Sequence, residues 1–391
     1  MTSEWNHSTI NDVCVLVTDG SHSSPKSVND GKYMVSVKDF TDYGFDFASC
    51  RMISNDDYET LKRNGCVPQI DDILIGKDGA RFFEDIIIYR QREKPALLSS
   101  IAILRCDKSK ILPDFLYYVL RTPSFRQDVK DNYGSGSAIP RIILKDFKRM
   151  MVSYPSLEKQ QSIISVLTAI DSKIQANTEI NDNLADLLQT VYQNRFGDTS
   201  SVANQGILSD ICSYSRDKVA VSELNASTYF STENMLSGKA GSTEATSLPT
   251  TPQTTACHKG DTLISNIRPY FKKIVYCEDK CGCSTDVLCF TPSQPQYSAY
   301  LFSTLYADKF FAFMVAGSKG TKMPRGDKQQ IMTYPVVLPS EEKLAGFNTI
   351  ASPLLEQIYS NGAENKRLSI LRDTLLPKLM SGEIDVAAVQ L

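Results

Sequence analysis

The sequence lacks several features that would assign a protein to a particular class. None of its 391 residues lies in a run approaching the roughly 20 apolar residues that a membrane-spanning helix needs. The first residues, MTSEWNHSTINDV, lack the basic and then apolar pattern of a signal peptide, so we expect a cytoplasmic protein. Hydrophobic residues make up 42% and charged residues 22%, which is typical of a globular protein, and the length predicts two or three domains.

The ten cysteines lack the paired CxxC spacing of a structural zinc site. Without a secretion signal, we expect free thiols rather than disulfides. The tightest cluster, YCEDKCGC, contains Cys277, Cys281 and Cys283, and Cys257 and His258 precede it. Metal binding there is an alternative, but the spacing favours buried or surface thiols. We therefore predict no metal and no cofactor.

Motifs for catalysis are missing as well. The chain has three histidines, and it contains neither the phosphate-binding pattern GxxxxGK[ST] nor the methyltransferase string Asn-Pro-Pro-Tyr. The GSGS at 134–137 follows a predicted helix instead of opening one after a strand, so it does not predict a phosphate site. The net charge of −3 argues only weakly against nucleic-acid binding, because binding depends on where the charges lie. We predict a non-catalytic protein.

An internal repeat is the strongest signal in the sequence. The stretches YPSLEKQQSI at 154–163 and LPSEEKLAGF at 338–347 share Pro, Ser, Glu and Lys at positions 184 apart. A gapless register from about residue 100 to 195 predicts a duplication. The same offset pairs Ser100 with Ser284, Leu104 with Leu288, Gly136 with Gly320, Pro140 with Pro324, and Arg141 with Arg325.

Each copy predicts a long helix after its shared proline. Pro-Ser before Glu-Lys is typical of a helix start, and Gly197 and Gly382 lie where C-terminal caps belong. A helix of roughly 38 residues would be about 57 Å long with an exposed apolar seam, so we expect the two seams to face each other. The seam positions, in steps of four and three, are Ile163, Leu167, Ile170, Ile174, Leu184, Leu188 and Val191 in the first copy, and Phe347, Ala351, Leu354, Ile358, Leu368, Arg372 and Leu375 in the second.

Asparagines interrupt both seams at the middle of each helix. Asn177 and Asn181 lie in the first helix, and Asn361 and Asn365 occupy the equivalent positions in the second. If the helices run antiparallel, the two pairs meet and form a central polar layer that fixes the register. The alternative is that these asparagines are solvated kinks in the seam. We favour the facing layer.

The remainder of each copy predicts a mixed α/β domain. Short β-rich runs include KYMVSV, DDILIG and SSIAIL in the first copy, and GDTLIS, FKKIVY and TDVLCF in the second. A single helix is expected over 114–129 and another over 297–314, each followed by a loop of small polar residues. We predict an α+β fold in which two mixed α/β domains are separated by two long helices that pair as an antiparallel coiled coil, a pseudo-two-fold internal repeat. The predicted parts are 1–155, 156–197, 198–338 and 339–391.

Two unequal domains held apart by rigid helices suit two patches of DNA separated by an untouched gap. The order of parts, the P-S-x-E-K helix entries, TDGSHSSPK near the start, YFSTENM in the second half and the closing KLMSGEIDV resemble the specificity (S) subunit of type I restriction–modification systems. The resemblance spans essentially the whole chain. One departure is Glu-Lys at the helix entries, at Lys159 and Lys343, where the family commonly has Glu-Gln.

The resemblance implies both a function and partners. Each domain would be a target-recognition domain that recognises one half of a bipartite, asymmetric site in double-stranded DNA. The helices would set the gap and dock two methyltransferase (M) subunits, which restriction (R) subunits join. Two identical M subunits need two equivalent surfaces, which explains why the helices repeat while the domains diverge.

Candidate DNA contacts are long donors or amides in the loops of the two domains. Arg141 and Arg325 occupy equivalent positions, which favours a phosphate or structural contact, because repeated residues cannot distinguish two half-sites. For every candidate the alternative is a solvated surface side chain. The candidates are His22, Lys26, Lys77, Arg81, Ser135, Ser137 and Arg141 in the first domain, and Asn266, Arg268, Tyr270, Lys272, Lys319, Lys322 and Arg325 in the second.

Two other functions remain as alternatives. A coiled-coil adaptor without a DNA role should expose apolar patches on its domains and no basic face. A self-contained methyltransferase with an unseen motif should bind its cofactor in isolation. We favour the specificity subunit.

Overall fold

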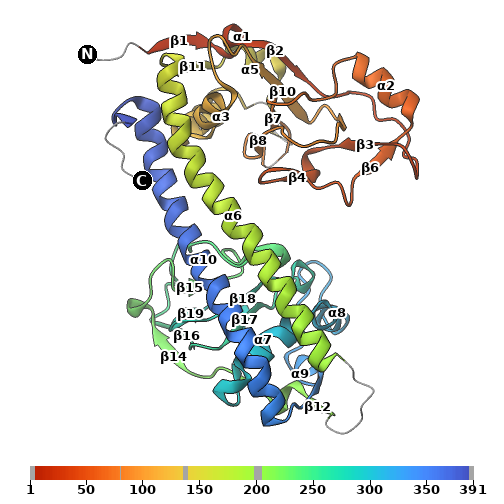
Figure 1. Ribbon diagram of the computed structural model, residues 1–391, viewed down its shortest axis with the longest axis vertical. Coiled ribbons are helices and arrows are strands. Elements are labelled where there is room, and N and C mark those ends of the chain that lie inside the picture. The colour runs from red at the N-terminus through yellow and green to blue at the C-terminus, as the bar shows by residue number, and fades with distance from the viewer. Residues whose placement is uncertain (1–4, 80, 135–139, 198–204, 387–391) are drawn as a thin grey trace. The chain divides into compact units, whose positions relative to one another are not determined.

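The computed structural model forms two compact units (Figure 1). The first unit holds Met1–Asp171 and Leu371–Leu391, and the second holds Ser172–Ile370. Each unit therefore includes a part of both long helices. The structure describes residues 5–79, 81–134, 140–197 and 205–386.

A four-stranded antiparallel sheet lies at the centre of the first unit. Its strands are β2 (Cys14–Asp19), β10 (Ile101–Cys106), β7 (Ile73–Gly76) and β8 (Ile86–Ile88), in that order. The strands β7 and β10 are rich in isoleucine and leucine and are almost wholly buried, because both faces of the sheet pack into hydrophobic clusters.

Smaller sheets and short helices complete the first unit. The strand β1 (Asn6–Thr9) pairs with β11 (Met151–Tyr154), so the two ends of the domain are joined. A second sheet has the order β6-β3-β9, and β4 pairs with β5. The remaining elements are β3 (Lys32–Val35), β4 (Phe40–Thr41), β5 (Gly44–Phe45), β6 (Arg51–Ile53), β9 (Ala96–Leu97), α1 (Ile10–Val13), η1 (Val37–Asp39), α2 (Asn55–Arg63), α3 (Pro113–Arg121), α4 (Pro123–Asn132) and α5 (Leu144–Arg149).

The second unit repeats this plan. Its central sheet has the order β13-β20-β17-β18, and β12 pairs with β21. A second sheet, β14-β16-β19-β15, also contains a parallel pair, β15 with β19, as β3 pairs in parallel with β9 in the first unit. The strands are β12 (Gln205–Ile207), β13 (Cys212–Tyr214), β14 (Lys218–Ala220), β15 (Tyr229–Phe230), β16 (Gln253–Cys257), β17 (Thr262–Ser265), β18 (Ile274–Tyr276), β19 (Cys281–Cys283), β20 (Val287–Pro292) and β21 (Pro335–Val337). The helices are η3 (Leu208–Asp210), η4 (Val221–Glu223), η5 (Ser237–Lys239), η6 (Pro269–Phe271), η7 (Pro295–Tyr297), α7 (Ser298–Tyr306), α8 (Asp308–Ala316) and α9 (Lys328–Met332).

The predicted gapless register, a constant offset of 184 between the two copies, is wrong upstream of α5 and α9. Leu104 lies opposite Ile73, the first residue of β7, whereas Phe290, not Leu288, lies opposite Thr262, the first residue of β17. A shift of two residues keeps every side chain on its own face of the strand, so the pattern gives no warning of it. The offset is 184 again from α5 and α9 onward.

Each predicted single helix is two helices. In the first unit Thr122 has extended backbone angles between α3 and α4, because the proline at 123 disfavours a helical residue before it. The Thr122 hydroxyl then accepts a hydrogen bond from Phe125 N. In the second unit the break falls at Ala307, which is also extended but has neither a proline after it nor a side-chain cap.

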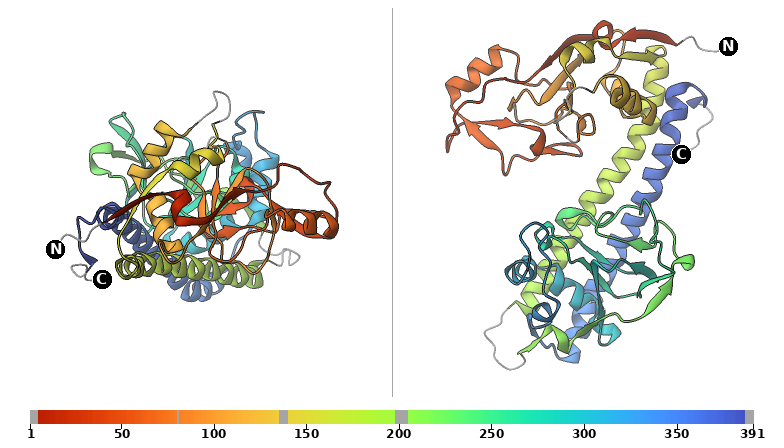
Figure 2. Two further views of the ribbon diagram at one scale, coloured as in Figure 1. Left: turned by 90° about the horizontal axis from the view of Figure 1, so that it is seen from above. Right: turned by 180° about the vertical axis from the view of Figure 1, so that it is seen from behind.

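The long helices are α6 (Leu157–Phe196) and α10 (Glu341–Ser381), which lie side by side in Figures 1 and 2. Both begin after a serine whose hydroxyl accepts a hydrogen bond, from Lys159 N to Ser156 and from Lys343 N to Ser340. Gly382 ends α10 with a positive φ of 75°, as a C-terminal cap requires. In the described part of the chain, no helix combines the length and the apolar character needed to cross a membrane.

Four asparagines join the two long helices within the second unit. Asn361 Nδ2 donates to Asn181 Oδ1 at 2.9 Å, and Asn177 Nδ2 donates to Asn365 Oδ1 at 2.9 Å. As the number rises on α6 it falls on α10, so the helices run antiparallel here. Asn177 and Asn361 are buried, with 1% and 6% of their surface exposed, and we call these four residues the asparagine layer.

The cysteines are all free. Cys257, Cys277, Cys281, Cys283 and Cys289 pack with Phe230 and Met235 in one hydrophobic cluster of the second unit. Within the described ranges, no group of three or more His, Cys, Asp or Glu side chains is arranged to hold a metal ion.

Candidate nucleic-acid interface

A pair of loops occupies the same place in both units. In the first, the chain leaving β7 pairs with the segment that leads into α5. Ile142 N donates to Lys77 O at 3.0 Å, and Gly79 N donates to Pro140 O at 2.9 Å. Asp78 and its bridge partner on the second segment thus bring together two stretches more than 60 positions apart in the sequence.

The second unit repeats the arrangement after β17. Arg268 N donates to Pro324 O at 2.7 Å, and Gly326 N donates to Asn266 O at 3.3 Å. Lys77 therefore lies beside the segment that holds Arg141, and Asn266 and Arg268 lie beside the segment that holds Arg325. The duplicated fold gives the chain two equivalent loop pairs.

A buried carboxylate organises the first loop pair. Asp19 Oδ2 lies 3.3 Å from Lys77 Nζ, and its Oδ1 lies 3.4 Å from His22 Nε2. Only 8% of the Lys77 side chain is exposed, whereas 75% of the His22 side chain is exposed. Lys77 therefore neutralises Asp19 inside the unit, and His22 is the exposed member of the group. Asp19 lies in the TDGSHSSPK motif, but its acidic type did not mark it as a candidate DNA contact.

The other candidates of the first unit are surface residues. Arg81 is 71% exposed in its side chain, and its Nη2 lies 2.7 Å from Asp85 Oδ1, which raises the pKa of the guanidinium. Lys26 and Arg141 are exposed. Ser135 and Ser137 lie outside the described residues.

The second loop pair carries a strained turn with exposed rings. Arg268 and Lys272 have positive φ angles of 50° and 51°, and they flank η6, the short helix from Pro269 to Phe271. Tyr270 is 50% exposed and Phe271 38%, with ring centroids 4.7 Å apart. Backbone strain of this kind persists where the surrounding structure enforces it and is common at functional sites. The turn presents two aromatic rings between two cations.

Two polar groups beside this turn are buried without a hydrogen bond. They are Asn266 Oδ1 and Arg268 Nε, and the whole of Asn266 is only 7% exposed. Buried polar atoms of this kind usually find a partner. Both of these atoms, which lack a hydrogen-bond partner, lie at the loop pair itself.

The cations of the second loop pair are matched with acids. Lys272 lies 3.0 Å from Asp308, Lys319 lies 2.5 Å from Asp327, and Arg325 Nη2 lies 3.0 Å from Asp286 Oδ1. The three cations are 39% to 81% exposed, so solvent screens the pairs and each cation can exchange its partner. The three acids were not among the candidates, because acidic residues do not attract DNA. Lys322 is exposed.

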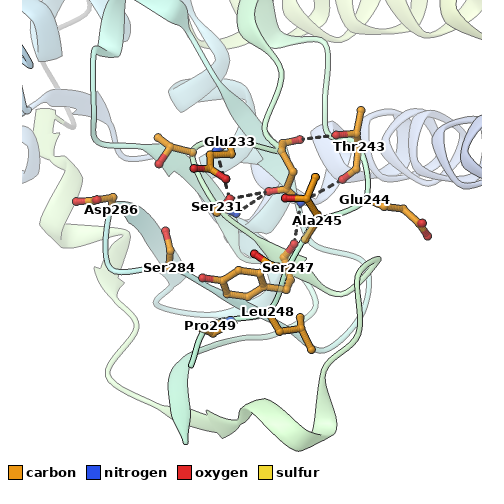
Figure 3. Close-up of a pocket in the computed structure, with 14 residues that line it drawn as sticks. Ser231, Glu233, Thr243, Glu244, Ala245, Ser247, Leu248, Pro249, Ser284 and Asp286 are labelled. Atoms are coloured by element: carbon orange, nitrogen blue, oxygen red, sulfur yellow. Dashed lines mark hydrogen bonds between the residues drawn. The ribbon is translucent and has the colours of Figure 1, made fainter. Parts of the chain in front are cut away.

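A pocket of about 360 Å³ adjoins Asp286 (Figure 3). It is lined by residues of the YFSTENM motif and by the loop from Thr243 to Pro249. Asn234 of the motif has a structural role, because its Nδ2 donates to Tyr229 O and Thr243 O and its Oδ1 accepts from Ser231 N. Three of its lining residues are acidic, namely Glu233, Glu244 and Asp286, and carboxylates are hydrogen-bond acceptors.

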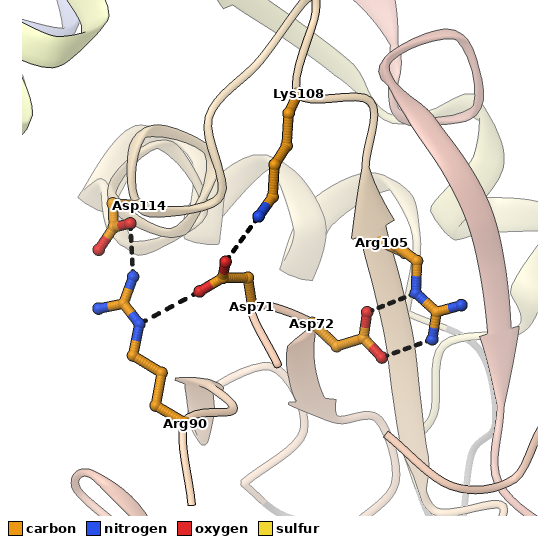
Figure 4. A network of polar contacts seen from close by, with 6 residues as sticks. All are labelled: Asp71, Asp72, Arg90, Arg105, Lys108 and Asp114. Carbon is orange, nitrogen blue, oxygen red and sulfur yellow. Dashed lines mark hydrogen bonds and ion pairs between the residues drawn. The ribbon is translucent and has the colours of Figure 1, made fainter. Parts of the chain in front are cut away.

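Other cations of the first unit belong to an internal network (Figure 4). Arg105 forms two hydrogen bonds of 2.8 Å with the buried carboxylate of Asp72. Its neighbour Asp71 binds Lys108 at 2.6 Å and Arg90 at 3.3 Å, and these bonds lower its pKa. These three cations are not part of the loop pair, so we do not include them in the interface.

Comparisons with known proteins address the predicted family. Residues 2–185 match the family described as type I restriction modification DNA specificity domain. This match covers just under half of the chain and supports the predicted family. Over 312 residues the chain is 23% identical to the type I restriction enzyme MjaIX specificity subunit of Methanocaldococcus jannaschii. This match covers 71% of each of the two chains.

Two further similarities point the same way. The chain is 28% identical over 123 residues to the type I restriction enzyme HindI specificity subunit of Haemophilus influenzae, a match that covers 30% of this chain and only 26% of that protein. The fold resembles the crystal structure of a type I restriction–modification system S subunit from M. genitalium, with a TM-score of 0.57 and 17% identity over 97% of this chain and 96% of that one. That likeness confirms the α+β fold with its two sheet-rich domains and long helices.

Proposed function

We propose that the chain is the DNA-recognition subunit of a type I restriction–modification complex. The observation that carries the proposal is the duplicated loop pair, which places candidate DNA contacts at equivalent positions in two units of a specificity-subunit fold. Each unit recognises one half of a bipartite, asymmetric site in double-stranded DNA, and the chain itself is not catalytic. Its expected location is the cytoplasm, where cellular DNA is accessible.

Arg141 and Arg325 are proposed as phosphate contacts. Their exposure and equivalent positions suit a contact that carries no base information. Tyr270 and Phe271, with the pocket beside Asp286, distinguish the second unit and are proposed to contribute to recognition of its half-site. Carboxylates in such a place accept hydrogen bonds from the amino group of cytosine in the major groove.

The long helices are proposed to dock two M subunits, to which R subunits bind. Leu187 and Leu371 lie 184 positions apart, and they are 47% and 40% exposed. Two exposed leucines at equivalent positions of a repeat suit two copies of one partner. Leu187→Glu or Leu371→Glu should remove one M subunit from the complex without unfolding the chain, as measured by native mass spectrometry.

The test of the proposed function is a map of genomic methylation in cells that express the cognate M subunit with and without this chain. A split adenine motif should appear only when the chain is present, and the map would give both half-sites and the gap. If methylation stays absent although the chain and the M subunit form a stable complex, the proposal is wrong. Exchanging residues 1–155 for the first domain of another such protein should change one half-site only.

The phosphate contact is tested on that motif by fluorescence anisotropy. Arg325→Ala should lower the affinity about tenfold and reduce the slope of log K against log salt by about 1. Lys280→Ala is the matched control, because Lys280 is also an exposed cation of the second unit paired with an acid, Glu223 at 2.8 Å. An equal loss in both variants would show only a general charge effect.

A further inference from the structure

A charged pair interrupts the apolar contact between the long helices in the first unit. Arg372 Nη1 of α10 lies 3.0 Å from Asp171 Oδ1 of α6. Only 18% and 19% of the two side chains are exposed. The Tyr118 hydroxyl donates to Asp171 Oδ2 at 2.7 Å, and Arg372 Nε donates to Asp373. We call Asp171 and Arg372 the charge layer.

The equivalent positions in the second unit are apolar. Leu355 lies 184 positions after Asp171, and Leu188 lies 184 positions before Arg372. They are 2% and 1% exposed and belong to one hydrophobic cluster. The hydrogen bonds of the asparagine layer set an antiparallel register in which position 188 comes opposite 354 and 355. We call Leu188 and Leu355 the leucine layer.

The hydrogen bonds between asparagines cannot distinguish α6 from α10. In an antiparallel pair of two α6 helices from different copies, Asn177 of each copy would face Asn181 of the other. In a pair of two α10 helices, Asn361 would face Asn365 in the same way. The amide-to-amide contacts are the same in all three pairings, so they fix the register but not the partner.

The other two layers do distinguish the partners. Between two α6 helices Asp171 would face Leu188 twice, and between two α10 helices Arg372 would face Leu355 twice. Tyr118 and Asp373 would keep their hydrogen bonds, so the loss is the ion pair itself. A charge held in a seam opposite a leucine costs more than a charge opposite its counter-ion.

We propose that the charge layer and the leucine layer together select the pairing of α6 with α10 and exclude the pairing of like helices from two copies of this chain. Duplicated helices share their heptads, their serine caps and their asparagines, so these shared features do not oppose self-association. Glu364 adds a smaller preference, because its carboxylate lies 3.4 Å from Lys173 and its repeat counterpart is Ile180. Asp171 differs from its repeat counterpart Leu355, and Arg372 differs from its counterpart Leu188. The pairing of α6 with α10 therefore places charge opposite charge and leucine opposite leucine, which pairs of like helices do not.

Two rearranged variants test the proposal in the full chain. Asp171→Leu with Leu355→Asp keeps the composition of the four positions but makes both intramolecular layers mismatched and both pairs of like helices matched. Adding Leu188→Arg and Arg372→Leu moves the charge layer into the second unit and matches the intramolecular pair again. Sedimentation velocity over a range of concentrations, with circular dichroism for folding, measures the outcome.

The two-residue variant should dimerise with an association constant at least about tenfold above that of the native chain, and the four-residue variant should return to the native value. If the two-residue variant folds and stays as monomeric as the native chain, the layers do not select the partner. If it fails to fold, recovery of the fold in the four-residue variant supports the proposal. Failure of that recovery overturns it.

Discussion

The contrast between Asp71 and Asp72 gives the sharpest test of the energetics of the first unit (Figure 4). Asp72→Asn removes the charge that Arg105 binds through two hydrogen bonds of 2.8 Å, and 1% of the Asp72 side chain is exposed. Breaking a buried pair on one side costs about 3–5 kcal/mol. Arg105 keeps 27% of its side chain exposed, so we expect the lower end, about 3 kcal/mol.

The assay is urea unfolding of the full chain, following the transition of the first unit. With a slope of about 2 kcal/mol per molar urea, a loss of about 3 kcal/mol lowers the midpoint by roughly 1.5 M. Asp71→Asn is the matched control, because its partners Lys108 and Arg90 are 60% and 53% exposed. Its positive φ of 71° suits asparagine, so it should cost under about 1 kcal/mol.

The two substitutions therefore share their chemistry, and burial is the main difference between the two sites. A midpoint for Asp72→Asn within about 0.2 M of the native value would refute the reasoning, since so small a shift is within ordinary surface effects. An equal loss for both variants would refute it as well, because burial would then not decide the cost.

Three further predictions concern single residues. Gly20→Ala should destabilise the first unit by about 2 kcal/mol, because a Cβ would lie 2.3 Å from Leu97 O. Gly362→Ala, which has open space around its Cβ within α10, should stabilise the chain by about 0.5–1 kcal/mol. Thermal unfolding of the two variants measures both effects. Because the pKa of Asp71 is lowered, the stability that its charge contributes is present above about pH 4 and is lost as the pH falls through the folded-state pKa. The native and Asp71→Asn chains should therefore converge in stability in acid, and a constant difference would contradict this. Burial raises the pKa of Asp261, so Asp261→Asn should leave the stability at pH 7 unchanged or higher. Any advantage of the variant should shrink as the pH falls, because Asp261 of the native chain is then protonated. A loss above about 1 kcal/mol at pH 7 would show that the charge of Asp261 is needed.

The fold could be predicted from the sequence where the chain repeats itself. The helix entries after Pro155 and Pro339 were visible because the same proline, serine, glutamate and lysine appear twice, and α6 and α10 begin at Leu157 and Glu341. The split of each domain helix was missed. Pro123 was a usable signal for the first break, but Ala307 carries none, so the second break depends on the packing around it.

The candidate site was only partly accessible to sequence reasoning. Loops with cations were selected by residue type, and the structure brings the segments that hold Arg268 and Arg325 together in one loop pair. Burial was not accessible, since the sequence does not show that Lys77 is enclosed with Asp19 or that Asp286 neutralises Arg325. Such partners are distant in the chain and unremarkable by type.

The sequence by itself determined the duplication, the two long helices and the family, because identical spacing and heptad periodicity are local properties that survive without the fold. Only the tertiary structure decided which charges face solvent and which face each other. Asp171 and Arg372 are 201 positions apart, and each is an ordinary helical residue on its own. Their pairing exists only where two helices meet, because the free energy of a charge depends on what surrounds it and not on its neighbours in the chain.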